Sequence, residues 1–206
     1  MQNIYIVDIR RLAPFFDSCA ALLKPERRER MLSYRFMDSR LRCLAGGLLM
    51  EKIAGEREIQ YTRNGKPFLH GGPYINLSHS GDFVCLAVCV SAEVGIDLEL
   101  HNDKNFITLG KTAFHPAEYD FFLQEPGKVR FHDLWTLKES YVKMIGSGFS
   151  IMPASFCVLP DKWVLPDNEI PFMKNLYHIS GYSMAICARE PIEEYIVDMP
   201  FPLMQQ

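Results

Sequence analysis

The sequence predicts an α+β fold whose helices and strands fall into two consecutive groups. Apolar runs typical of strands occur in both halves of the chain, at residues 83–90 and 182–189. Segments with helical periodicity lie between such runs, and residues 38–55 carry an inner stripe of leucine and alanine. The chain has 206 residues, of which 48% are hydrophobic, so it is large and apolar enough to bury a substantial core.

The first half of the chain begins with a weakly alternating strand and continues with two helices. Pro25 suits the first position of the first helix, and Asp38 is expected to cap the second. The pair Gly46-Gly47 costs the second helix little and allows close packing. The expected elements are strands at 3–9, 74–79, 83–90 and 94–100, helices at 25–35 and 38–55, and a turn-rich segment at 63–73.

The second half is expected to contain three helices followed by strands. Pro116 begins the second of these helices, and Gly146 ends the long third one. The expected elements are helices at 104–113, 116–124 and 129–145, and strands at 155–159, 162–165, 174–180 and 182–189. Residues 79–89 also align with residues 179–187, because each has a Ser-Gly turn before an apolar strand that carries cysteine. Hairpins of this kind are common, so the repeat alone supports two similar halves only weakly.

Composition excludes several classes of protein. The formal net charge is −3, which does not suggest general nucleic-acid binding. The N-terminus lacks the basic and apolar regions of a signal peptide, and no apolar run approaches the length of a membrane span. None of the six cysteines forms a Cys-x-x-Cys pair, and Cys85 and Cys89 share one face of an apolar strand. Buried free thiols, and hence a cytoplasmic protein, are the favoured interpretation.

Two carboxylates lie at alternate positions of the segment Gly95–Glu99. Because side chains alternate along a strand, Asp97 and Glu99 project from one face, and Ile96 and Leu98 point into a core. Such alternation usually marks a solvated face. The other interpretation is a metal site, since two acids on one face repel each other unless a cation lies between them. Mg²⁺ takes oxygen ligands of this kind.

A third acid lies on the helix expected at 129–145. Trp135, Glu139 and Lys143 are spaced at i, i+4 and i+8, so they share roughly one helix face. The ordinary interpretation is a surface Glu-Lys pair beside a core tryptophan. Each motif is weak alone, but their combination at this spacing is specific.

Together the two motifs resemble the signature of the 4′-phosphopantetheinyl transferases of the larger, Sfp type. Val94-Gly95-Ile96-Asp97 matches its first part, and Trp135-Thr136-x-Lys138-Glu139-Ser140-x-x-Lys143 matches its second part, after slightly fewer residues than is usual. Further segments with counterparts in the family are Pro25–Arg30, Asn64–Pro67, Asn76–Gly81 and Gly146–Ser150.

The resemblance implies a pseudo-dimer of two similar α+β halves with the active site in the cleft between them. Residues 1–100 would form the N-terminal half, on the side of the coenzyme A 3′-phosphate. Residues 101–206 would form the C-terminal half, with the catalytic helix and the carrier-protein side. Because one chain supplies both walls of the cleft, a monomer is expected.

The resemblance also implies a reaction. The 4′-phosphopantetheine arm of coenzyme A is transferred to a serine of an apo acyl or peptidyl carrier protein, and adenosine 3′,5′-bisphosphate leaves. By resemblance, Asp97, Glu99 and Glu139 hold Mg²⁺, or Mn²⁺ in its place, and Lys143 meets the pyrophosphate or the developing charge. The catalytic residues are thus Asp97, Glu139 and Lys143. Either Glu139 or a water beside it takes the serine proton.

Coenzyme A carries a 3′-phosphate that requires cations. By resemblance, Arg27, Arg30, Arg42 and Lys66 line that end of the ligand, and Ser78 and His79 bind phosphate oxygens. Arg27 and Arg30 lie at i and i+3, so they can converge on one anion. A solvated helix face is the alternative for the two arginines, and a structural histidine is the alternative for His79.

Two other functions are compatible with part of the pattern. A non-catalytic module that binds coenzyme A or a carrier protein would be expected to have lost a metal carboxylate or the lysine. The three carboxylates and Lys143 are all present. A Mg²⁺-dependent nuclease would be expected to have a basic groove with interleaved aromatic residues. The sequence leaves open whether the client carrier serves fatty-acid, polyketide or nonribosomal-peptide synthesis, although by analogy the size favours the secondary-metabolism type.

Overall fold

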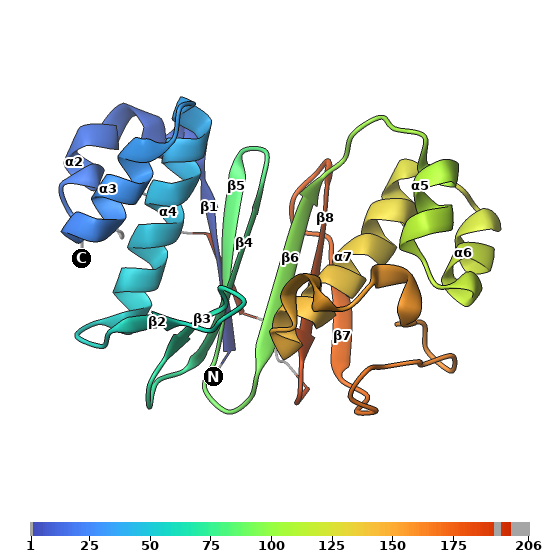
Figure 1. Cartoon of the computed structure of the whole chain (residues 1–206). Helices are drawn as coiled ribbons and strands as arrows, with labels where there is room; N and C mark the ends of the chain where they lie inside the picture. Colours follow the sequence, from blue (N-terminus) through green and yellow to red (C-terminus); the bar gives the residue numbers. More distant parts are fainter. Residues whose placement is uncertain (1, 192–194, 199–206) are drawn as a thin grey trace.

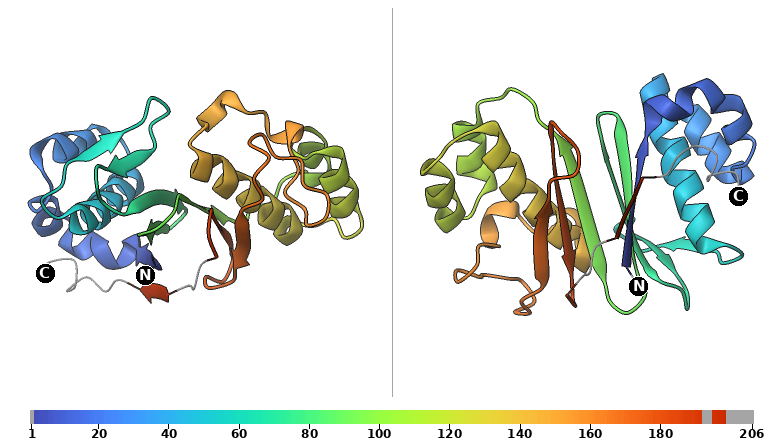
Figure 2. Two further views of the ribbon diagram at one scale, coloured as in Figure 1. Left: turned by 90° about the horizontal axis from the view of Figure 1, so that it is seen from below. Right: turned by 180° about the vertical axis from the view of Figure 1, so that it is seen from behind.

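The computed structural model describes residues 2–191 and 195–198. Two β-sheets lie side by side, and helices cover the outer face of each sheet (Figure 1). The same layered arrangement is visible from below and from behind in Figure 2. No helix in this part of the chain combines the length and apolar composition needed to cross a bilayer.

The first sheet has the strand order β4-β5-β1-β9. Its strands are β1 (Gln2–Asp8), β4 (Tyr74–Ser80), β5 (Phe83–Cys89) and β9 (Tyr195–Asp198). The helices beside it are α1 (Ile9–Leu12), α2 (Phe16–Ala20), α3 (Pro25–Ser33) and α4 (Met37–Ala54), with a 3₁₀ turn at Ala13–Phe15. A separate hairpin is formed by β2 (Ile59–Tyr61) and β3 (Pro67–Leu69).

The second sheet has the order β6-β8-β7. Its strands are β6 (Val94–Leu100), β7 (Phe172–Leu176) and β8 (Tyr182–Ala188). Its helices are α5 (Phe106–Ala113), α6 (Pro116–Leu123) and α7 (Lys128–Ile145), and 3₁₀ turns follow at Gly148–Ser150 and Pro153–Ser155.

The two sheets share one pairing pattern. Strand β5 pairs antiparallel with both β1 and β4, and β8 pairs antiparallel with both β6 and β7. The repeated Ser-Gly turns predicted from the sequence lie in the hairpins β4–β5 and β7–β8. The boundary near residue 100 remains a prediction, but strand pairing places the crossover between the sheets earlier, at residues 90–93.

Apolar contacts fill the spaces between the layers. The expected core positions Ile96 and Leu98 are fully buried among residues of both sheets. Between α4 and the first sheet, a Cβ on Gly46 would lie 2.9 Å from Leu77 Cδ2. The predicted close packing at the glycine pair is therefore confirmed, because a side chain on Gly46 would require the methyl groups of Leu77 to move.

Several predicted local features are wrong. Phe36 is the N-cap of α4 and no side chain caps that end, so Asp38 lies inside the first turn, where its charge favours the helix dipole. The strands expected at 155–159 and 162–165 reduce to one bridge between Cys157 and Val164. A turn with Asp161 at positive φ separates them, and the apolar residues before it are buried against α7 as irregular chain. Short apolar runs do not distinguish these states.

Other elements had no sequence signal strong enough to predict them. These are the helical turns between residues 9 and 20, the hairpin of β2 and β3, and strand β9, which pairs parallel with β1.

Candidate active site

Polar side chains of β4 join the two halves where the edge strands β4 and β6 meet. Asn76 Oδ1 accepts a hydrogen bond of 2.9 Å from the backbone N–H of Ile96. Ser78 Oγ accepts from Leu98 N at 3.2 Å, and Ser80 Oγ accepts from Leu100 N at 3.0 Å. Alternate residues of a strand share one face, so a single face of β4 satisfies alternate N–H groups of β6. We call these three residues the polar seam.

The same seam holds the first predicted metal ligand. The carboxylate of Asp97 is buried, and its Oδ1 accepts hydrogen bonds from Ser78 Oγ at 3.0 Å and from Lys143 Nζ at 2.5 Å. Lys143 Nζ also contacts Ser78 Oγ at 2.9 Å. The second carboxylate oxygen, Oδ2, is buried and has no hydrogen-bond partner in the described part of the protein. Such an orphaned acceptor is costly unless a cation or donor meets it.

The other two acids face the same place and are electrostatically strained. Burial, followed by the charge of Asp97, raises the pKa of Glu99, and a hydrogen bond of 3.0 Å from Ser80 Oγ opposes that rise. Burial and the charge of Asp97 also raise the pKa of Glu139, and Lys143 opposes that rise. Burial alone would lower the pKa of Lys143, but Asp97 and its other anionic neighbours raise it. The bonds of Asp97 to Ser78 and of Glu99 to Ser80 place these two acids on one face of β6, as their alternate spacing predicts.

The donor set fits a hard divalent cation. Three carboxylates disfavour one another's charge, and Asp97 presents a buried oxygen without a partner. As the side chains lie, no three acidic, histidine or cysteine groups among the described residues converge closely enough to hold an ion, and the ammonium of Lys143 lies against Asp97. Binding an ion would thus require Glu99 and Glu139 to turn toward Asp97.

Close backbone packing fixes α7 against β6. A Cβ on Gly95 would lie 2.0 Å from the carbonyl oxygen of Ser140 and 2.4 Å from Met144 N. Real Cβ contacts are never that short, so only glycine lets the helix approach this strand. The close approach brings Glu139 and Lys143 to the face that carries Asp97 and Glu99.

Lys138, next to Glu139 in sequence, has a different task. Its Nζ donates to Glu118 Oε2 and to the carbonyl oxygen of Phe156, each at 2.6 Å, and both charged side chains are buried. Glu118 also accepts from the backbone N–H groups of His115 and Val158 at 2.9 and 2.8 Å. This ion pair joins α7 to α6 and to the irregular segment around Phe156 and Val158 that follows α7. Lys138 therefore lies on another face of α7 than Lys143, which contacts Asp97.

A cavity of about 290 Å³ lies on the side of β4 opposite to Ser78. It is lined by Arg27, Arg30 and Arg42, together with His79 and Tyr61. Three guanidinium groups around one small cavity create a strong site for an anion. The convergence of Arg27 and Arg30 predicted from their spacing is thus observed.

The guanidinium groups of this cavity are held by neighbouring side chains and carbonyls. Arg27 bonds the hydroxyl of Tyr61, and Arg42 donates to the carbonyl oxygen of Gly81 at 2.9 Å. Although part of its ring reaches solvent, burial lowers the pKa of His79, and the charges of Arg42 and Lys143 lower it further. The neutral imidazole of His79 is consequently favoured in the free protein.

Two residues expected at the basic cavity lie elsewhere. Ser78 is on the opposite face of β4 from His79, and its hydroxyl is engaged with Asp97, Lys143 and Leu98. Lys66 lies beside the cavity, between the lining residues Gly65 and Pro67, but its ammonium bonds the carbonyl oxygen of Met144 near the end of α7. Burial lowers the pKa of Lys66.

Sequence reasoning overlooked three contributors to this site. Ser80 holds Glu99, Asn76 holds the backbone of β6, and Tyr61 holds Arg27. The alternate spacing of Asn76, Ser78 and Ser80 was a signal for a shared face, whereas nothing in the sequence connects Tyr61 to Arg27.

Comparison with known proteins gives this geometry its context. The profile of the 4′-phosphopantetheinyl transferase superfamily matches residues 93–187, which include β6 and α7. The chain is 32% identical over 202 residues to the 4′-phosphopantetheinyl transferase psf-1 of Bacillus pumilus, covering 89% of this chain and 83% of the relative. It is 30% identical over 190 residues to the 4′-phosphopantetheinyl transferase Sfp of Bacillus subtilis, covering 83% and 84%.

A more distant relative is the L-aminoadipate-semialdehyde dehydrogenase-phosphopantetheinyl transferase of Xenopus laevis. The identity is 29% over 170 aligned residues, and the alignment covers 69% of this chain and 56% of the relative. The superfamily profile covers the three acids and Lys143. The chain therefore belongs to the 4′-phosphopantetheinyl transferase family.

Proposed function

We propose that this chain transfers the 4′-phosphopantetheine arm of coenzyme A to a serine of an apo carrier protein, with Mg²⁺ as the metal. The observation that carries the proposal is the meeting of Asp97, Glu99, Glu139 and Lys143 on one side of β4, with the arginine-lined cavity on its other side. One strand thus separates a site for a phosphate group from a site for phosphoryl chemistry.

The arginine-lined cavity is the proposed site of the coenzyme A 3′-phosphate. Arg27, Arg30 and Arg42 supply positive charge, and His79 gains a proton on binding. Lys66 lies where the two halves meet, so it could exchange its bond to Met144 for a phosphate oxygen. Ser78, whose hydroxyl is already engaged, is assigned to positioning Asp97 and Lys143 instead of binding phosphate.

The 3′-phosphate assignment can be tested with one arginine pair on the same helix. Arg30→Gln removes a lining residue, and Arg28→Gln removes an exposed arginine that does not line the cavity. Arg30→Gln should weaken coenzyme A by about 1.5–3 kcal/mol and 3′-dephospho-coenzyme A much less, because a charge-assisted contact is lost. Arg28→Gln should change neither affinity in calorimetry. Equal losses for both ligands with Arg30→Gln would refute the assignment.

Asp97, Glu99 and Glu139 are the proposed metal ligands. A bound Mg²⁺ supplies Lewis acidity and a template for the pyrophosphate oxygens. Asp97→Asn keeps the shape of the side chain but removes its charge, so it should lose Mn²⁺ binding, detected by electron paramagnetic resonance, together with transfer activity. Calorimetry should still detect coenzyme A, since the arginine-lined cavity is untouched. Native Mn²⁺ affinity in Asp97→Asn would show that the ion lies elsewhere.

The residues of the chain have distinct tasks in the proposed reaction. The carrier serine oxygen forms a bond to the β-phosphorus, the bond from that phosphorus to the bridging oxygen breaks, and adenosine 3′,5′-bisphosphate leaves. Lys143 stabilises the charge that develops during this exchange. Glu139, or a water beside it, takes the proton of the serine.

The carrier protein is proposed to dock beside Glu99, on α5. A small cavity of about 250 Å³ there is lined by Glu99, Phe106, Leu109 and Trp135. On α5 itself, the side chain of Ile107 is 52% exposed, although it is large and apolar. Ile107→Asp should raise the KM for the carrier and leave coenzyme A affinity unchanged, whereas Ile170→Asp, at a site that is 67% exposed, should change neither. An unchanged KM in Ile107→Asp would exclude this surface.

The two halves are proposed to be a pseudo-dimer with the active site between them. Supporting this, the pairing β4-β5-β1 in the first sheet corresponds to the pairing β7-β8-β6 in the second sheet. The candidate residues also come from both halves. One chain then suffices, so activity per chain should not change on dilution in the range where sedimentation measures a monomer. Six free thiols favour the reducing cytoplasm, which cell fractionation can test.

The direct product of the proposed reaction is adenosine 3′,5′-bisphosphate. Chromatography should detect its release only when coenzyme A, Mg²⁺ and an apo carrier protein are all present. Running the assay with fatty-acid, polyketide and nonribosomal-peptide carriers would identify the client. Release without a carrier would indicate hydrolysis and contradict transfer.

A further inference from the structure

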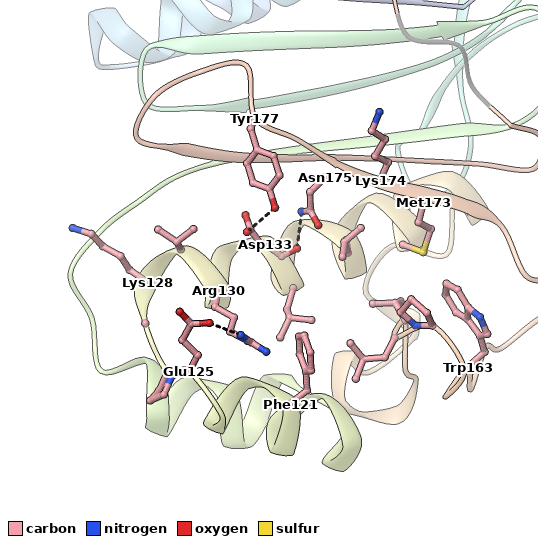
Figure 3. Close-up of a pocket in the computed structure, with 18 of the residues that line it drawn as sticks. Phe121, Glu125, Lys128, Arg130, Asp133, Trp163, Met173, Lys174, Asn175 and Tyr177 are labelled. Carbon is pink, nitrogen blue, oxygen red and sulfur yellow. Dashed lines mark hydrogen bonds and ion pairs between the residues drawn. The ribbon is translucent and has the colours of Figure 1, made fainter.

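The largest cavity among those described lies away from the proposed cleft. It has a volume of about 900 Å³ and is enclosed by α6, the first half of α7, strand β7 and the segment around Trp163 (Figure 3). Of its α7 residues, Arg130, Asp133, Leu134 and Leu137 lie on a different face of the helix from Glu139 and Lys143. The proposed reaction gives this cavity no task.

The walls of this cavity are mostly apolar. Leu134 and Leu137 from α7 contribute to them, as do Phe121 from α6 and Phe172 from β7, and Trp163 lies at one end. An apolar cavity of this size is typical of sites that bind small organic molecules. Asp133 keeps its negative charge, but both of its carboxylate oxygens are engaged, because they accept hydrogen bonds from the hydroxyls of Ser183 and Tyr177.

Arg130 is the unusual group in this lining. Its guanidinium lies over the ring of Phe121, 3.9 Å from the ring centroid, and its Nη1 donates to Glu125 Oε2 at 2.8 Å. Its Nε is buried and has no hydrogen-bond partner in the described part of the chain. Glu125 is 84% exposed, so it is a weak partner that an incoming anion can replace. The first turn of α7, which begins here, has no capping side chain and no acidic residue.

We propose that this cavity binds a small amphiphilic anion, namely an apolar chain that ends in one carboxylate. The carboxylate replaces Glu125 as the partner of Arg130 Nη1, and the chain lies over Leu134 and Leu137 toward Trp163. Of the other charges at the cavity, Lys128 pairs with Asp103 at 3.2 Å and stays near solvent. The proposal is independent of the proposed transfer reaction.

Decanoate is the probe, and 1-decanol and decylamine are its uncharged and cationic counterparts. Calorimetry on the full chain should detect decanoate with the highest affinity of the three. Arg130→Gln should weaken decanoate about ten- to hundredfold and leave 1-decanol unchanged, because a charge-assisted contact is lost. Arg63→Gln, which removes an exposed arginine of the other half, should change nothing.

Location is tested by fluorescence. The chain has two tryptophans, so Trp135→Phe leaves Trp163 as the only indole, and decanoate should change its emission. Leu137→Phe, checked for folding by circular dichroism, should lower decanoate affinity by filling the cavity. Saturating coenzyme A should not displace decanoate. Equal affinity for decanoate and 1-decanol, native affinity in Arg130→Gln, or displacement by coenzyme A would each overturn the proposal.

Discussion

Replacing Lys138 with methionine should destabilise this protein more than most single substitutions. Lys138 and Glu118 form an ion pair of 2.6 Å in which the side chains are 1% and 0% exposed. Lys138→Met leaves the carboxylate of Glu118 buried without its cation, and the carbonyl oxygen of Phe156 loses its donor. Breaking a buried pair in this way costs about 3–5 kcal/mol.

The assay is urea unfolding at neutral pH, with stability taken from the midpoint at constant m-value. Lys128→Met is a matched control on the same helix, because Lys128 pairs with Asp103 at the surface, where the side chains are 50% and 92% exposed. That exposed pair should contribute at most about 1 kcal/mol. Adding Glu118→Gln to Lys138→Met should restore about 1 kcal/mol or more, since the uncompensated charge is gone.

Two results would refute this reasoning. A loss below about 1 kcal/mol for Lys138→Met would mean that solvent reaches Glu118. Additive effects of Lys138→Met and Glu118→Gln would mean that the two residues are not energetically coupled.

Three further predictions concern the active site. Gly95→Ala should cost about 1–3 kcal/mol of stability by forcing α7 away from β6, and it should reduce transfer. Gly127→Ala is the control, because a Cβ there meets nothing within 4 Å, and it should preserve stability and transfer. In NMR titrations, the pKa of His79 should be low in the free protein, because of burial and nearby cations, and should rise when adenosine 3′,5′-bisphosphate binds. Affinity for that ligand should therefore fall as pH rises through the pKa of the bound state, and an identical pKa with and without ligand would remove His79 from the anion site. Ser80→Ala removes a hydrogen bond that lowers the pKa of Glu99, so the pKa of Glu99 in the metal-free protein should rise in NMR titrations, and Ser80→Thr should return it. An unchanged pKa in Ser80→Ala would mean that this hydrogen bond does not influence Glu99.

Periodic patterns were the part of this structure that sequence could predict. Alternation placed Asp97 and Glu99 on one face and buried Ile96 and Leu98, and helical spacing placed Glu139 and Lys143 on one face of α7. These predictions succeeded because each depends on neighbours within one element.

Contacts between elements could not be predicted in this way. Ser78 and His79 are adjacent in sequence, yet they face opposite sides of β4, and only the fold shows that the acids lie on the side of Ser78. The reach of Lys66 to α7 likewise depends on how the halves pack. The segment around Val158 was expected to be a strand because it is apolar, but Glu118 and α7 hold it as irregular chain.

The measurement that tests the central claim most directly is the intact mass of a carrier protein after incubation with this chain, coenzyme A and Mg²⁺. The account predicts that the carrier gains the mass of one phosphopantetheine. It also predicts no gain with Asp97→Asn or with a carrier whose acceptor serine is alanine. An unmodified carrier from every client class, with the folded chain and saturating coenzyme A, would contradict the account.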